Sequence, residues 1–203
     1  MYIPSFNRID DPAILLEAMR AYSFAILFGP DANGDPGATH LPLIIQQEGE
    51  YGTIEGHFAR ANPHWKSLAG QKTLVVFPGP HAYVSPSLYN SKQSVPTWNY
   101  IAIHATGTLH LIEDEAGKEA LVRNLIAIHE PAHLDQWQSQ TDQYRFAMLK
   151  NITGFRIPIE KLEGKFKLSQ NRPDPDRINI QAAESIGSPD EQALAAWMRR
   201  LSI

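Results

Sequence analysis

Residues 57 to 65, His-Phe-Ala-Arg-Ala-Asn-Pro-His-Trp, contain the groups needed to bind a phosphate. A β-strand pattern ends at Phe58, Arg60 supplies a guanidinium group, and Asn62 followed by Pro63 is a typical helix start. Helix starts expose backbone N–H groups, and arginine forms paired hydrogen bonds with phosphate oxygens. The segment therefore predicts an anion site. The alternative is that Arg60 pairs with a surface carboxylate and that Asn62 only caps its helix.

Two further segments, residues 79–86 and 96–100, concentrate aromatic, amide and hydroxyl side chains, and we expect them to be loops that flank strands. Such side chains suit a flat heteroaromatic ligand, because rings stack on its faces and polar groups bind its edge. Aromatic residues at strand ends are also common covers of a hydrophobic core. Both interpretations stay open.

The most basic segment is residues 164–172, which holds Lys165, Lys167 and Arg172 and no carboxylate. Its polar and apolar residues alternate, as they do in an edge strand. Three interpretations follow: a second phosphate or anion contact, a local nucleic-acid patch, or a solvated edge strand protected by lysines.

The segment from His129 to His133 matches the H-E-x-x-H signature of zinc proteases. That signature needs an intact helical turn, and Pro131 in its middle costs about 3 kcal/mol in a helix interior. The helical spacing of apolar residues also stops at Ile128. We therefore interpret the match as a helix C-terminus, and the remaining histidines indicate no metal site.

Composition limits the remaining chemistry. The chain has 203 residues, 43% of them hydrophobic and 20% charged, which is typical of a packed domain. The absence of cysteine excludes disulfides, thiolate nucleophiles and cysteine-bound metals. A net charge of −4 gives no overall attraction to nucleic acid or anionic lipid. No apolar stretch approaches the roughly 20 residues that cross a bilayer, and no signal peptide is evident, so we predict a cytoplasmic protein.

The elements that must position these groups follow from periodicity and turn signals. Residues 100–111 alternate most clearly and predict a half-buried strand, in which Gly107 suggests a bulge or bend that curves the sheet. Strands followed by helices indicate a β-barrel-like α+β domain. We expect strands over residues 24–28, 39–46, 52–58, 73–77, 100–111 and 154–162, and helices over residues 11–22, 62–68, 114–129, 144–149 and 188–202.

A proline-rich and charged stretch, Arg172 to Asp176, marks the predicted end of the main body. Ser188 to Glu191 is a capping box that starts a final helix with one apolar stripe. We therefore predict one domain over residues 1–172 and a C-terminal helical extension over residues 173–203. The extension is expected to pack on the same domain or on a partner subunit.

Five separated phrases together resemble the PaiB family, described as FMN-binding negative transcriptional regulators. The resemblance extends from residue 1 to about residue 180. It implies a split β-barrel like that of the pyridoxamine-phosphate-oxidase-type flavoproteins, with flanking helices, and a homodimer with flavin clefts at the subunit interface. The phrases are Met-Tyr-Ile-Pro-Ser-Phe at the start and residues 57–65, 79–86, 96–100 and 164–172.

The resemblance also implies FMN as the cofactor and a set of residues that contact it. Arg60 and its neighbouring backbone would hold the phosphate. Three residues of the aromatic segments would lie near the ring system, and three of the basic segment would lie near the cleft, from the same or the other subunit. The implied set is His57, Arg60, Asn62, Tyr83, Trp98, Asn99, Lys165, Lys167 and Gln170.

Two classes of function are compatible with these residues. In the first, which we favour, the protein is a regulator in which flavin, or another phosphate-bearing heteroaromatic, changes the surface of a dimer. In the second, it is a flavin-dependent oxidoreductase or a haem-handling enzyme on the same scaffold. No basic helix-turn-helix is evident, so direct contact with DNA would need a local patch near residues 165–172.

Overall fold

The computed structural model describes residues 1–203, which form ten strands, seven α-helices and three short 3-10 helices. The chain divides into two compact units. The first unit comprises residues 1–15, 78–103 and 163–203, and the second comprises residues 16–77 and 104–162. Strands β6 (Lys72–Val84) and β7 (Thr97–Thr108) belong in part to each unit. None of the helices has the length and apolar character that a membrane span requires.

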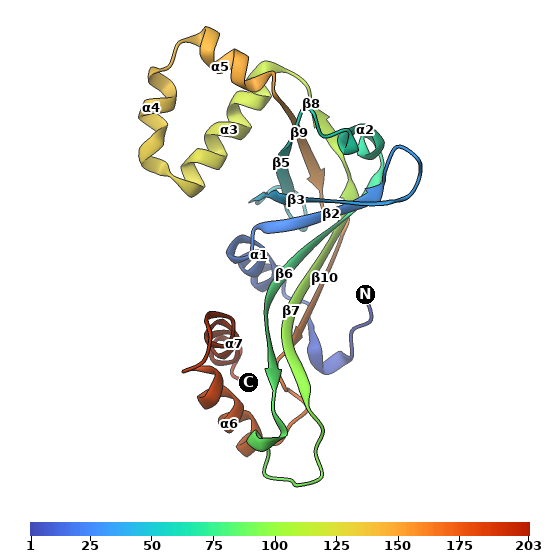
Figure 1. The fold of residues 1–203 in the computed structure, drawn as a ribbon, viewed down its shortest axis with the longest axis vertical. Coiled ribbons are helices and arrows are strands. Elements are labelled where there is room, and N and C mark those ends of the chain that lie inside the picture. Colours follow the sequence, from blue (N-terminus) through green and yellow to red (C-terminus); the bar gives the residue numbers. More distant parts are fainter. The chain divides into compact units, whose positions relative to one another are not determined.

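The sheet of the first unit places strands in the order β1, β10, β7, β6. Strand β1 (Arg8–Ile9) pairs antiparallel with β10 (Lys161–Lys167), so that Arg8 lies opposite Lys165. Helices α6 (Asp174–Glu184) and α7 (Pro189–Arg200) pack on each other, as Figure 1 shows in red. The ring of Trp197 on α7 meets that of Phe166 edge-on, with 5.2 Å between centroids. The predicted capping box of Ser188 and Glu191 is confirmed.

The second unit contains a hairpin and a separate four-stranded sheet, all antiparallel. The hairpin strand β2 (Phe24–Pro30) also pairs with β6. Phe58 and Phe155 belong to the core of the second unit, and their ring centroids lie 5.0 Å apart. The other strands are β3 (Pro36–Pro42) of the hairpin and β4 (Ile44–Gln46), β5 (Thr53–Ala59), β9 (Ile152–Pro158) and β8 (His110–Ile112) of the second sheet. Helix α1 (Pro12–Ala21) begins where it was predicted, after Asp11.

Residues 114–149 form a helical segment of the second unit (Figure 1). Asp114 caps the first helix by accepting a hydrogen bond from the Gly117 N–H at 2.7 Å. Helix α3 (Glu115–His129) ends at His129, which confirms that the H-E-x-x-H segment does not lie on one helix. The remaining helices are α4 (Leu134–Ser139), which was not predicted, and α5 (Asp142–Leu149).

Three strand predictions are wrong in their extent. Residues 39–46, 100–111 and 154–162 were each expected to form one strand, and each contributes to two strands of different sheets. The breaks lie at positions where the backbone bonds to other segments: the Leu43 N–H donates to Ser23 O, the Leu109 N–H to Gln71 O and the Ile159 N–H to Gly52 O. Gly107 lies at a close approach between segments, since a Cβ atom there would be 2.1 Å from Pro158 O.

The loops expected at residues 79–86 and 96–100 are wrong for most of their length, because residues 79–84 extend strand β6 and residues 97–100 extend strand β7. Pro80 lies within β6, since proline is tolerated in strands where no ladder hydrogen bond is needed. Helix α6 was missed because its Asp174-Pro175-Asp176 start was interpreted only as the end of the main body, although proline and acidic residues are favoured in a first helical turn.

Candidate functional site

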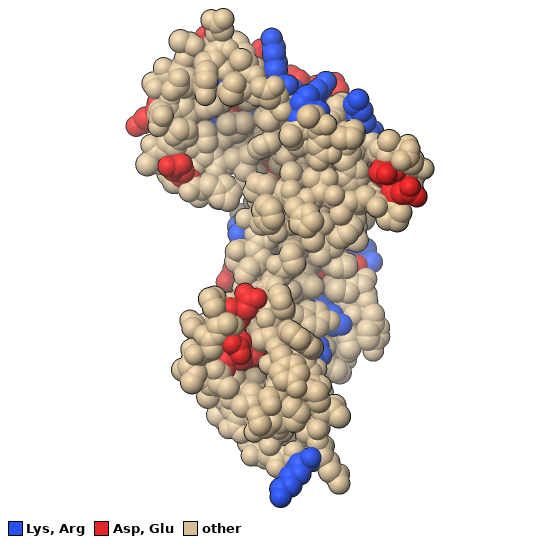
Figure 2. Space-filling model, viewed as in Figure 1, with Lys and Arg blue, Asp and Glu red and all other residues tan.

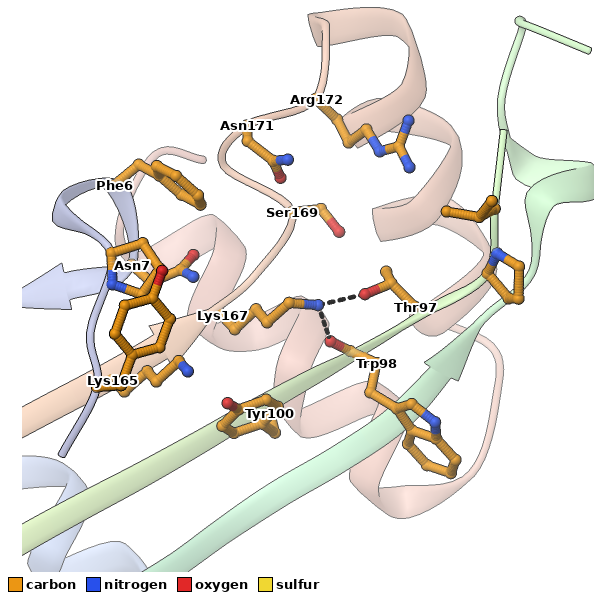
Figure 3. Close-up of a pocket in the computed structure, with 14 residues that line it drawn as sticks. Phe6, Asn7, Thr97, Trp98, Tyr100, Lys165, Lys167, Ser169, Asn171 and Arg172 are labelled. Atoms are coloured by element: carbon orange, nitrogen blue, oxygen red, sulfur yellow. Dashed lines mark hydrogen bonds between the residues drawn. The ribbon is translucent and has the colours of Figure 1, made fainter. Parts of the chain in front are cut away.

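A cavity of about 630 Å³ lies in the first unit, among the N-terminal segment, strand β7 and the residues from β10 onward (Figure 3). Three cations line it and no carboxylate does. Aromatic rings complete its walls, so the cavity combines positive charge with stacking surfaces. The lining residues that matter here are Tyr2, Phe6, Asn7, Thr97, Trp98, Tyr100, Lys165, Lys167, Ser169, Asn171 and Arg172.

Positive charge converges on this cavity without a lining acid to neutralise it. Lys165 Nζ lies 5.5 Å from the ring centroid of Tyr2 and 5.3 Å from that of Tyr100. Lys167 Nζ donates hydrogen bonds to Thr97 Oγ1 and to the Trp98 carbonyl oxygen. Burial lowers the pKa of the Lys167 ammonium, and the charges of Lys165 and Arg172 lower it further. An anion in the cavity would relieve this repulsion.

The turn after β10 brings polar groups to the cavity. Gln170 holds this turn, since its side-chain oxygen accepts from the Leu168 N–H at 2.7 Å and its amide nitrogen donates to Phe166 O. Ser169 adopts a left-handed conformation with φ of 64°, which is uncommon for a non-glycine residue. Such local strain is typical of functional sites.

Asn99 lies beneath the cavity and not in its lining. It is fully buried, accepts from Ser169 Oγ at 2.9 Å and donates to Glu184 Oε1 at 3.0 Å. Burial raises the pKa of the Glu184 carboxyl to about 7. Both ends of the Asn99 amide are therefore engaged within the protein, and the residue positions Ser169.

Tyr83 on β6 and Trp98 on β7 form an exposed aromatic face of the first unit. Their ring centroids lie 5.9 Å apart at an interplanar angle of 76°, and each residue is about half exposed, 51% and 52%. The His81 ring lies 6.2 Å from Trp98. Because Trp98 also lines the cavity, the aromatic face adjoins it.

Arg60, in the second unit, lines a separate hollow of about 290 Å³ together with Lys118 and Lys150. Its Nη1 donates to Thr153 Oγ1 at 3.2 Å, and its guanidinium carbon lies 4.7 Å from the ring centroid of Trp65. The hollow also contains Glu113, so its charge is partly compensated. Arg60 is thus fixed by stacking and a hydrogen bond at a basic surface.

Two other predicted residues lie near Arg60 in the sequence. Asn62 accepts a hydrogen bond from the His64 N–H at 3.0 Å, directly before helix α2 (His64–Leu68), whose N-cap position is Pro63. This local bond favours the alternative interpretation of Asn62 given above. His57 on β5 is half-buried, its Nδ1 has no hydrogen-bond partner, and burial lowers the pKa of its imidazole.

The nine predicted contacts therefore fall into two groups. His57, Arg60 and Asn62 belong to the second unit and the other six to the first. Of these six, Trp98 and the two lysines line the cavity. Tyr2, Phe6 and Asn7 line the cavity and were not predicted as contacts, although the opening phrase that carries the resemblance includes Tyr2 and Phe6. No group of three or more histidine, cysteine, aspartate or glutamate side chains could hold a metal ion.

Known proteins show the family of this chain. The family model described as "Putative FMN-binding domain" matches residues 1–161. The chain is 35% identical to "Protease synthase and sporulation protein PAI 2" of Bacillus subtilis, over 98% of the chain and 96% of that protein. It belongs to the PaiB family. An uncharacterized protein of Emericella nidulans is 29% identical over 80% of each chain.

Solved structures share the fold of this PaiB-family protein. The flavocytochrome Anf3 of Azotobacter vinelandii is 16% identical and matches 95% of the chain and 78% of its own length, with a TM-score of 0.63. An FAD and heme binding protein of Mycobacterium smegmatis is 15% identical and matches 85% of the chain and 78% of its own, also with a TM-score of 0.63. The predicted α+β split-barrel fold is confirmed.

Proposed function

We propose that this PaiB-family protein binds FMN through the cavity of the first unit and acts as a flavin-responsive negative transcriptional regulator. The observation that carries the proposal is the convergence of three cations, with no lining carboxylate, on a cavity with aromatic walls. FMN joins a phosphate dianion to a flat ring system, so it needs these two kinds of contact. The volume of about 630 Å³ is within the range of small-molecule sites.

The residues of the first unit divide into contacts and supports. We assign the phosphate to Lys167 and Arg172, whose positive charges repel each other, and the ring to Trp98 and Tyr100. Gln170 and Asn99 act as positioning residues, through the turn and through Ser169. When bound, FMN supplies one- and two-electron redox chemistry.

The second group of predicted contacts is His57, Arg60 and Asn62, which the resemblance implies for flavin binding. The basic surface of Arg60, Lys118 and Lys150 is the alternative place for the single phosphate of FMN. We further propose a homodimer, in which such contacts come from either subunit. This assembly follows from the family resemblance.

Regulation is proposed to follow from the effect of the bound ligand on a protein surface. The face in Figure 2 carries separate basic and acidic side chains and no continuous basic surface, and the net charge is −4. These features favour a ligand-dependent contact with a partner over extensive contact with DNA. The Bacillus subtilis relative is named a protease synthase and sporulation protein.

A second candidate is a flavin-dependent oxidoreductase, which the fold shared with a flavocytochrome favours. Oxidation of NADPH or NADH by the FMN-loaded protein, followed at 340 nm, separates the two functions. Steady turnover above that of free FMN would support the enzyme, and stable binding without turnover would support the regulator.

The direct test of the proposed function is titration of the protein with FMN, followed by flavin fluorescence. Lys167→Met is expected to weaken binding by about tenfold to a hundredfold, because one charge-assisted contact is lost. Lys92→Met, which removes an exposed lysine outside the cavity, is the control and should bind like the wild type. Arg60→Ala measures the contribution of the second unit. Unchanged affinity in Lys167→Met would contradict the assignment of this cavity.

A further inference from the structure

Asn7 presents a polar atom that the protein itself leaves unsatisfied. The residue is only 2% exposed, and its side-chain oxygen Oδ1 is buried without a hydrogen-bond partner. Buried carbonyl groups almost always have a partner, because an unpaired one loses its hydrogen bonds to water without replacement. Asn7 also lines the cationic cavity. Its oxygen is therefore a candidate acceptor for a donor on the bound ligand.

The backbone around Asn7 fixes the position of its side chain. The Asn7 N–H donates to Pro4 O at 2.9 Å, which closes the 3-10 turn Ser5–Asn7. Strand β1 begins at the next residue, and Arg8 pairs there with Lys165. The Asn7 side chain is thus held between a closed turn and a strand, and it is preorganised for binding.

The cavity presents different chemistry on its two sides. Figure 3 shows Asn7 and Phe6 on one side, Thr97 and Arg172 on the other, and Lys167 between them. Lys167 directs its ammonium group to Thr97 and to the Trp98 carbonyl. Those bonds engage two of the three N–H donors of Lys167, and no donor within the protein bonds to Asn7 Oδ1.

We propose that Asn7 is a specificity-determining residue whose Oδ1 accepts a hydrogen bond from a ring N–H of the bound heteroaromatic. This inference rests on the proposed binding of FMN to the same cavity. The flavin ring has one such donor, N3–H, which lies between two carbonyl groups. The ligand class is therefore an anionic heteroaromatic with an imide-type N–H, held by cations at its phosphate and by Asn7 at its ring edge.

The test compares FMN with 3-methyl-FMN, in which a methyl group replaces the N3 hydrogen. The wild type is expected to bind FMN about tenfold more tightly, since the analogue leaves Asn7 Oδ1 without a donor. Equal affinities for the two flavins would overturn the inference without any variant. Failure of the wild type to bind either flavin would instead refute the proposed function.

Variants then assign the discrimination to Asn7. Asn7→Leu keeps most of the side-chain volume and removes the acceptor, so its affinity for FMN should fall about tenfold. Asn7→Ala should bind the two flavins with nearly equal affinity. Asn33→Ala removes an exposed asparagine outside the cavity and should retain the wild-type preference for FMN. A preference for FMN that persists in both Asn7 variants would show that another group recognises N3–H.

Discussion

Replacement of Glu184 by glutamine should make the protein more resistant to alkaline unfolding. Glu184 ends helix α6, is 4% exposed, and accepts a hydrogen bond from Asn99 at 3.0 Å. Its second oxygen has no partner. Burial raises the pKa of this carboxyl from 4.5 to about 7, and the charge of Glu191 on α7 acts in the same direction. Folding therefore favours the protonated form.

The raised pKa determines the sign and the size of the effect. Below pH 4.5 the carboxyl is protonated in both states, and its ionisation does not affect stability. Between pH 4.5 and 7 the unfolded chain releases this proton while the folded protein retains it, so stability falls as pH rises. A shift of 2.5 pKa units, from 4.5 to about 7, corresponds to a total loss of about 3 kcal/mol, which is complete above pH 7.

Glutamine preserves an acceptor for Asn99 and cannot ionise. The free energy of unfolding, measured with urea at pH 4.5, 6, 7 and 8.5, should therefore improve in Glu184→Gln relative to the wild type by about 3 kcal/mol across this range. Any cost of the new amide group is independent of pH and cancels in this comparison. A difference between the two proteins that stays constant from pH 4.5 to 8.5 would refute the reasoning.

Three further substitutions test separate parts of the structure. Glu160→Gln should show the opposite pH dependence, because hydrogen bonds from Lys72 and Thr108 lower the pKa of Glu160 and its contribution to stability is present above pH 4.5. The loss of stability in the variant should therefore diminish as the same urea series is extended below pH 4.5. Gly107→Ala should lower the free energy of unfolding by about 1–3 kcal/mol, because the added methyl group meets Pro158 O, and an unchanged free energy of unfolding would contradict this. Asp114→Ala should lower the free energy of unfolding by about 1 kcal/mol in the same assay, because helix α3 loses its cap. Asp114→Asn should retain most of the wild-type stability, because asparagine also caps helices well.

The sequence predicted those elements in which local signals and tertiary structure agree. The alternation at residues 100–111 gave the buried positions of β7 correctly, because one face of that strand packs on the core and the other does not. The cap and proline signals at Asp11 and Ser188 located two helices. Element boundaries were predicted less well. A change of sheet at Leu43 depends on a backbone bond to Ser23, which leaves no pattern in the local sequence.

The candidate site was predicted in part for the same reason. The basic segment around Lys165 and Lys167 was recognisable because three cations occur there without an acid. Asn7 was not, because its significance lies in the absence of a hydrogen-bond partner after folding. Asn99 is the opposite case, because a contact with the ligand was predicted and not found. Both ends of its side-chain amide form hydrogen bonds within the protein, to Glu184 and Ser169.

The central claim is that the cationic cavity of the first unit binds the phosphate of FMN. The most direct measurement compares the dissociation constants of FMN and riboflavin, which differ only in that phosphate, for the wild type and for Lys167→Met. Two charge-assisted contacts predict that the wild type binds FMN at least about a hundredfold more tightly, and that the preference shrinks in the variant. Equal affinities of the wild type for FMN and riboflavin, or an unchanged preference in Lys167→Met, would contradict the claim.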